Sequence, residues 1–143
     1  MKLAIAADHN GYELKKYIVK HMKNIEFIDF SSKELIPTDD HPDYAFKLGE
    51  YCVKNNVRGI LICGSGIGMS IACNKVKGVR CGRVTSMKDV IATRNDNDAN
   101  VISFAGYLKP ERAIRIIETF IETPFSTDER YIRRVNKVSK YEK

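Results

Sequence analysis

A cysteine followed directly by a glycine-rich segment is the part of this chain best suited to chemistry. The apolar run Ile60–Ile62 leads into Cys63, and Gly64-Ser65-Gly66-Ile67-Gly68 follows, before a stretch compatible with a helix. A tight turn between a buried strand and a helix directs backbone N–H groups and the positive end of the helix dipole at one point, which can hold an anion. Because a helix N-terminus favours the thiolate form of a nearby cysteine, the pattern predicts a reactive thiol beside an anion hole. The alternative is a small core residue that ends a strand.

The glycine spacing argues against two common nucleotide-binding motifs. Glycines at positions 64, 66 and 68 lack the G-x-G-x-x-G spacing of dinucleotide-binding proteins. No G-K-[ST] follows them, as it would in a P-loop. The segment is therefore assigned to neither class of nucleotide site.

Three further polar groups could contribute to a site. Asp8-His9 follows the first apolar segment, and such a pair can move protons or bind a phosphate. Residues 94–100 (RNDNDAN) are unusually polar. Arg130 and Arg134 lie four residues apart, so they share one face of a helix, where two guanidinium groups suit a phosphate. The alternative for Asp8-His9 is an ordinary polar turn, and the alternative for residues 94–100 is a solvated loop. The alternative for the two arginines is a solvated, charged helix face.

The composition is that of a soluble single domain, residues 1–143, with 43% hydrophobic and 29% charged residues and a net charge of +6. Four scattered cysteines form neither a CxxC pair nor a Cys/His metal motif, which indicates a reducing, cytoplasmic location and no metal site. No apolar run approaches the roughly 20 residues of a membrane helix. Six basic and three acidic residues in 127–143 could indicate nucleic-acid binding, but the mixed signs favour a solvated amphipathic helix.

Apolar segments and turn residues predict five short strands that alternate with helices. The strands are expected at residues 2–7, 26–30, 58–63, 79–84 and 101–104. The helices are expected to start at six residues that favour a helix N-terminus, which are Asn10, Pro42, Gly66, Ser86, Pro110 and Thr127. The last helix has no strand beside it, and we expect it to reach a neighbouring subunit.

This alternation predicts an α/β fold, a three-layer αβα sandwich around a Rossmann-like, five-stranded parallel sheet. In such folds ligands bind at the carboxyl ends of the strands, near a point at which the strand order reverses. The residues that we expect to meet there are Asp8, His9, Cys63 through Gly68, Thr85 and the polar run 95–100.

Taken together, these segments resemble the ribose-5-phosphate isomerase type B and galactose-6-phosphate isomerase family. The resemblance runs from end to end, in the family's order and spacing. It rests on six segments, which are Ala7-Asp-His-Asn-Gly11, Pro42-Asp-Tyr-Ala45, Gly59–Ala72 (GILICGSGIGMSIA), Asn74–Arg80 (NKVKGVR), Asn97–Val101 (NDANV) and Arg130-x-x-x-Arg134-Val135.

The resemblance implies an enzyme that interconverts aldose and ketose phosphates without a metal or another cofactor. Cys63 resembles the base that moves a proton between C1 and C2 of the sugar. The backbone at Ser65 and Gly68 resembles the hole for the cis-enediolate oxygen. The Ser65 hydroxyl and Asp8 are implied to assist proton movement on the substrate oxygens. One subfamily has a glutamate after the last loop glycine, where this chain has Met69, so the resemblance is to the cysteine type.

The resemblance also implies a site shared between subunits of a homodimer or a dimer of dimers. His9, Arg130 and Arg134 resemble the clamp for the phosphate, and Asn97 is implied to reach into a neighbour's site. The full set of implied substrate- and phosphate-binding residues is His9, His41, Gly64, Asn97, Arg130 and Arg134.

Four positions depart from the family pattern. Asp96 stands where the family has the catalytic histidine that opens the sugar ring. Tyr107 lies near the usual place of an arginine for the phosphate, His41 replaces a tyrosine, and Tyr131 replaces a histidine. Because a tetrulose phosphate cannot close into a phosphorylated furanose ring, the loss of the ring-opening histidine suggests a short-chain substrate.

The sequence thus predicts an aldose–ketose isomerase of the ribose 5-phosphate to ribulose 5-phosphate type, with a cysteine base and a cis-enediolate intermediate. Alternative substrates are tetrulose 4-phosphate, allose 6-phosphate and galactose 6-phosphate. A non-catalytic phosphosugar-binding subunit is a second class, but a degenerate copy need not keep Cys63, Ser65 and Asp8. The expected partners are a small phosphorylated sugar and further copies of the chain, with no nucleic acid and no membrane.

Overall fold

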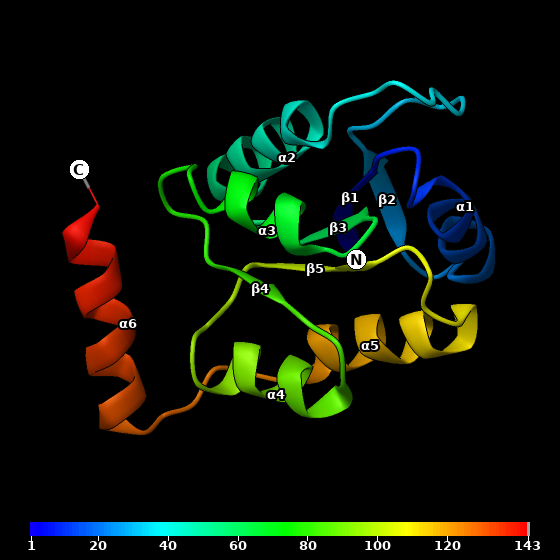
Figure 1. Cartoon of the computed structure of the whole chain (residues 1–143). Helices are drawn as coiled ribbons and strands as arrows, with labels where there is room; N and C mark the ends of the chain where they lie inside the picture. Colours follow the sequence, from blue (N-terminus) through cyan, green and yellow to red (C-terminus); the bar gives the residue numbers. More distant parts are fainter. Residues whose placement is uncertain (143) are drawn as a thin grey trace.

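A computed structural model, which describes residues 1–142, has a five-stranded sheet with helices on both faces (Figure 1). The strands are β1 (Lys2–Ala7), β2 (Glu26–Asp29), β3 (Gly59–Cys63), β4 (Cys81–Arg83) and β5 (Val101–Ala105). The helices are α1 (Tyr12–His21), α2 (His41–Asn55), α3 (Ile67–Cys73), α4 (Met87–Asn95), α5 (Pro110–Glu122) and α6 (Glu129–Tyr141). All strand pairs are parallel in the order β2-β1-β3-β5-β4, which confirms the predicted α/β fold. Within the described residues, none of the helices is long and apolar enough to cross a membrane.

Side-chain alternation along the strands divides the interior into two apolar cores, one on each face of the sheet. One core joins α1, α4 and α5 to strand residues such as Ile5 and Ile62. The other joins α2 and α3 to strand residues such as Leu61 and Cys63. Successive residues of a strand point to opposite faces, so Ile62 and Cys63 enter different cores. Cys63 therefore faces α2 and α3 at the carboxyl end of β3.

Most element boundaries lie within about three residues of those predicted, although β4 is three residues long where six were expected. The predicted cap of α4 is confirmed, because Ser86 Oγ accepts the N–H of Asp89 at 3.2 Å. The predicted cap of α1 is wrong. That helix follows Gly11 without a side-chain cap, and Asp8 Oδ1 instead accepts the N–H groups of Asn10 and Gly11.

The C-terminal helix α6 stands apart from the three layers, beyond the β4 edge of the sheet (Figure 1). It begins one residue later than predicted. Asp128 caps it in place of Thr127, because the Asp128 carboxylate accepts the N–H of Arg130 at 2.9 Å. Val135 is the buried residue of this helix. Most of α6 is therefore available for contact with another molecule, and its contact with a second subunit stays a prediction.

A buried lysine ties α1 to the segment that follows β2. The side chain of Lys15 is 4% exposed, and its Nζ lies 2.8 Å from Asp29 Oδ2. The same ammonium group donates to Ser31 Oγ and to the Ser32 carbonyl, each at 3.0 Å. Ser31 Oγ also accepts the N–H of Ala7 at the end of β1. Lys15 therefore fixes the start of the loop 30–40, which runs past the carboxyl end of β1.

Substitution of this lysine tests the anchor. Lys15→Met is expected to lower the free energy of unfolding by about 2 kcal/mol, because methionine keeps the apolar stem but leaves three oxygen acceptors without their donor. Urea denaturation at fixed protein concentration measures the loss. Lys16→Met is the matched control, since Lys16 is exposed and lies at the same 5.4 Å from the Tyr12 ring centroid. The control should change stability by less than about 0.5 kcal/mol. Equal stability of the two variants would contradict the anchor.

Candidate active site

The candidate site lies at the carboxyl ends of β1 and β3, which are neighbours in the sheet. After β1 the chain moves outward to β2, and after β3 it moves toward β5 and β4, so the strand order reverses here. The register pairs Ala7 with Ile62, and the N–H of Asp8 donates to the Ile62 carbonyl at 3.2 Å. Asp8 and Cys63 therefore end adjacent strands side by side, as the sequence predicts.

The Cys63 thiol lies inside the turn made by its own glycine loop. Its Sγ accepts the N–H of Gly66 at 3.2 Å, and the residue is 3% exposed. Gly66 has a φ of 81°, in the left-handed region, where the chain reverses into α3. Ser65 Oγ accepts the N–H of Ile67 at 3.1 Å. The thiol is thus held in one orientation beside the backbone N–H groups of the loop.

The glycine loop packs so closely against neighbouring segments that side chains are excluded. A Cβ on Gly66 would lie 2.8 Å from the Cα of Phe104 in β5, and a Cβ on Gly68 would lie 2.5 Å from Nε2 of His41. Ser103 Oγ donates to the Gly66 carbonyl at 2.7 Å. These contacts fix the loop to β5 and place the His41 ring over Gly68, so the predicted binding residue His41 joins this site.

A guanidinium group also reaches the loop. Arg83, the last residue of β4, donates from Nε to the Ser65 carbonyl at 3.1 Å. Its exposed side chain brings positive charge to the solvent side of the loop. Arg83 was not predicted from sequence, because a single charged residue at the end of an edge strand has no distinguishing signal.

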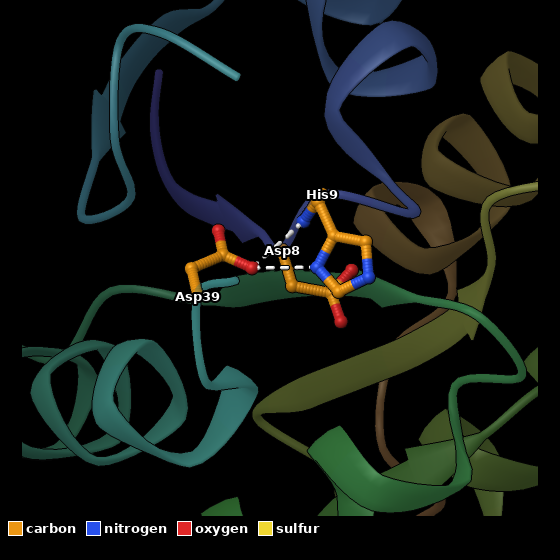
Figure 2. Close-up of side chains that lie close together, drawn as sticks. All are labelled: Asp8, His9 and Asp39. Carbon is orange, nitrogen blue, oxygen red and sulfur yellow. Dashed lines mark hydrogen bonds and ion pairs between the residues drawn. The ribbon is translucent and has the colours of Figure 1, made fainter. Parts of the chain in front are cut away.

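A carboxylate from the loop between β2 and α2 reaches His9 (Figure 2). Asp39 Oδ1 accepts Nδ1–H of His9 at 2.8 Å and the backbone N–H of His9 at 3.1 Å. Asp39 Oδ2 accepts the hydroxyl of Tyr44 at 3.1 Å. Asp39 was not among the site residues predicted from sequence. The acidic pair Asp39-Asp40 before a helix was a visible signal, but only the path of the loop brings it to a residue 30 positions away.

This contact shifts the ionisation of both partners. The hydrogen bond to Asp39 raises the pKa of His9, desolvation opposes the shift, and the charges of Asp8 and Asp39 assist it. Burial by itself would raise the pKa of Asp39, but the hydrogen bonds from His9 and Tyr44 outweigh it and hold that pKa below its ordinary value. The pair is therefore biased toward imidazolium and carboxylate near neutral pH.

Among residues 1–142, the same three side chains also lie close enough together to hold a metal ion. One ligand atom from each of Asp8, His9 and Asp39 lies within 4.8 Å of the others. Two of the oxygens already have partners, because Asp8 Oδ1 accepts two backbone N–H groups and Asp39 Oδ1 accepts the ring N–H and the backbone N–H of His9. Hydrogen bonding thus accounts for the cluster, and we do not interpret it as a metal centre.

The other cysteines are unsuited to proton transfer. Burial raises the pKa of the Cys52 thiol and of the Cys81 thiol to about 12. Burial also raises the pKa of Cys73. Each of these thiols therefore stays protonated near neutral pH.

Two predicted site residues lie at the amino ends of the strands, on the opposite side of the sheet from Cys63. Asp96 and Asn97 belong to the loop between α4 and β5, at the amino end of β5. The prediction that residues 95–100 lie with Asp8 and Cys63 at the carboxyl ends of the strands is therefore wrong. A loop that enters a parallel strand lies at the end opposite to the loop that leaves it. Asp96 accepts a hydrogen bond from Nδ2 of its neighbour Asn95 at 2.7 Å.

The two predicted arginines are also outside this site within one chain. Arg134 and Asn97 line a groove of about 430 Å³ between α6 and β4. Arg130 is held by Asp128, with Nη2 2.7 Å from Oδ2. The same pairing lowers the pKa of Asp128 to about 2. The predicted residues that one chain does bring together are Asp8, His9, His41, Cys63, Gly64, Ser65 and Gly68.

The fold and the site define a Rossmann-like α/β enzyme, with titratable groups and a thiol at the reversal of strand order. Residues 3–138 match the ribose/galactose isomerase family, and the chain belongs to that family. The predicted enzyme class, an aldose–ketose isomerase, is confirmed by this membership.

Individual relatives match over nearly their whole length. A probable ribose-5-phosphate isomerase B of Mycoplasma pneumoniae is 40% identical over 97% of this chain and 93% of its own. A putative sugar phosphate isomerase of Bacillus subtilis is 42% identical over 99% of this chain and 97% of its own. The crystal structure of ribose-5-phosphate isomerase B from Mycoplasma genitalium with bound ribulose 5-phosphate superimposes with a TM-score of 0.92 at 35% identity, over 98% of this chain and 95% of that one.

Proposed function

We propose that this chain isomerises a phosphorylated aldose to its ketose, in a reaction of the ribose 5-phosphate to ribulose 5-phosphate type, with Cys63 as the base. The observation that carries the proposal is the Cys63 thiol at the carboxyl end of β3, held by the N–H of Gly66 within the glycine loop. Relatives named as ribose-5-phosphate isomerase B support the substrate class.

In the proposed reaction the Cys63 thiolate removes the proton from C2 of the aldose. The electron pair of the C2–H bond forms a C1–C2 double bond, and the former carbonyl oxygen on C1 becomes the enediolate oxygen. The backbone N–H groups of Ser65 and Gly68 stabilise this charge. The Ser65 hydroxyl and Asp8 carry the proton from the C2 hydroxyl to the oxygen on C1, and the thiol returns its proton to C1. No atom is gained or lost.

We further propose that the phosphate is bound by His9 of one subunit together with Arg130 and Arg134 of a second copy. Within one chain the two arginines lie on α6, outside the site that holds Cys63 and His9. A symmetric dimer could supply α6 of each copy to the site of the other, and most of this helix is exposed. Asn97, which shares a groove with Arg134, would arrive from the same second copy.

The residue at position 96 bears on the choice of sugar. Asp96 takes the place that the resemblance assigns to a ring-opening histidine, which favours a sugar that does not close into a ring. Ribose 5-phosphate is the leading substrate by family, and erythrose 4-phosphate is the short-chain alternative. Allose 6-phosphate and galactose 6-phosphate remain further candidates.

A substrate panel tests the proposal. Erythrose 4-phosphate, ribose 5-phosphate, allose 6-phosphate and galactose 6-phosphate are each incubated with enzyme in deuterated water. Proton NMR then follows ketose formation and deuterium entry at the exchanging carbon. We expect at least one phosphosugar to turn over with exchange, and unphosphorylated ribose to show none. A large preference for ribose 5-phosphate over the four-carbon sugar would remove the short-chain hypothesis. No turnover of any phosphosugar would remove the isomerase assignment.

A further inference from the structure

The carboxylate of Asp39 accepts three hydrogen bonds, two from His9 in the turn after β1 and one from Tyr44 in α2. Its side chain is 8% exposed. One oxygen accepts both the ring and the backbone N–H of His9, and the other accepts the hydroxyl of Tyr44 in the first turn of α2. The carboxylate therefore joins the end of β1 to the start of α2 through His9.

These contacts determine which ring nitrogen of His9 is free. An ionised carboxylate can only accept, so His9 Nδ1 must carry the proton that it shares with Asp39. Figure 2 shows the second ring nitrogen on the side of the ring away from Asp39. The ring is one-third exposed, so its outer nitrogen can meet a ligand. Two further bonds on the same carboxylate prevent it from following a rotation of the ring.

The groups that face His9 also favour its charged form. Asp39 and Asp8 both carry negative charge toward the ring, and Tyr44 bonds to the far oxygen of Asp39. Asp8 is itself occupied by two backbone N–H groups, so it acts on the ring through its charge and not as a second acceptor. With Asp39 in contact, a protonated His9 persists to higher pH than an ordinary histidine.

We propose that Asp39 is a positioning residue for substrate binding, which fixes the His9 ring with Nε2–H toward the substrate phosphate and keeps the ring cationic. This inference rests on the proposed function in one respect, that His9 binds the phosphate of the substrate. Asp39 does not touch the substrate. A charge-assisted bond from imidazolium to phosphate is stronger than one from neutral imidazole, so Asp39 acts on affinity more than on proton transfer.

Asp39→Asn tests the role, because asparagine keeps the shape and an oxygen acceptor but removes the charge. Well below pH 6.5 the ring is protonated in both enzymes, so their KM values should agree within about twofold. Between pH 6.5 and the raised pKa of wild-type His9, only the wild-type ring stays charged, and KM of the variant should rise about tenfold with kcat nearly unchanged. The ionisation of the substrate phosphate is common to both enzymes and cancels in the ratio.

Asp40→Asn is the matched control, since it removes the same charge from the adjacent, exposed residue, which makes no side-chain cap bond. It should leave the KM profile unchanged. In a His9→Asn background, Asp39→Asn should have no further effect on KM. A KM ratio between Asp39→Asn and wild type that does not vary with pH would mean a purely structural role and overturn the proposal.

Direct titration separates failure of this inference from failure of the proposed function. The chain has three histidines, so the His9 ring resonances can be assigned with His9→Asn. A wild-type His9 midpoint at or below 6.5 overturns the inference, even if Asp39→Asn fails to fold. Titration with inorganic phosphate should perturb Nε2 of His9, and binding should weaken in Asp39→Asn at a pH between 6.5 and the measured midpoint of wild-type His9. If that holds while no phosphosugar reacts, the isomerase assignment fails and the role of Asp39 stands.

Discussion

Replacement of Cys63 by alanine is expected to lower kcat for phosphosugar isomerisation by about 10³-fold, with KM changed less than about threefold, since a positioned general base contributes typically 10²–10⁴-fold. The variant removes the proposed proton acceptor and with it the Sγ partner of the Gly66 N–H, but the hydrogen bond from Ser103 of β5 to the Gly66 carbonyl stays in place. Substrate binding, which we propose to depend on His9 and the glycine loop, should persist. The measurement is the rate of ketose formation together with deuterium entry at C2 of the remaining aldose.

The matched control for this variant is Cys52→Ala. Cys52 is also buried, but it lies on α2, and its thiol is held protonated by a pKa of about 12. This control should lose about 1 kcal/mol of stability, as expected for a small buried truncation, and keep its kcat. Proton exchange at the wild-type rate in Cys63→Ala would remove the thiol from the role of base, whereas equal losses of kcat in both variants would point to a structural cause.

Gly66→Ala is expected to have the largest effect on stability, a loss on the order of 3 kcal/mol. Gly66 has a φ of 81°, and a Cβ there would lie 2.8 Å from the Cα of Phe104. The close contact is with the backbone of β5, an interior strand of the sheet, so it cannot be relieved by rotation of a side chain. The loop would have to move away from β5, which takes the Gly66 N–H away from Cys63 Sγ. We therefore also expect kcat to fall by at least tenfold.

Gly78→Ala separates the two causes of this loss. Gly78 has a φ of 89°, so alanine meets the same backbone penalty, but its Cβ would approach only the side chain of Val53. This control should lose about 1 kcal/mol and keep its kcat, because it lies outside the candidate site. Thermal unfolding at fixed protein concentration compares the two variants, and a Gly66→Ala protein that unfolds at the temperature of Gly78→Ala would contradict the packing argument.

The part of the site predicted best from sequence is the segment around Cys63. The apolar strand, the glycine turn and the helix start are contiguous, so each is encoded by its immediate neighbours. The alternation of strands and helices likewise predicted the parallel sheet and the position of Asp8 beside Cys63 at its carboxyl edge. Boundaries were less certain, as the cap at Asp128 in place of Thr127 illustrates, because adjacent polar residues compete for the same N–H groups.

Only the tertiary structure decided which distant residues share the site. Asp39 reaches His9 through the path of the loop 30–40, whose start Lys15 anchors beside the end of β1, and no local pattern encodes a contact over 30 positions. The polar run 95–100 has the composition of a binding loop. Because it leads into β5, it lies at the amino ends of the strands, away from Cys63. Amino-acid type and spacing therefore determined the chemistry available to this chain. Strand direction and loop path, which depend on packing of the whole sheet, determined which of those groups act together.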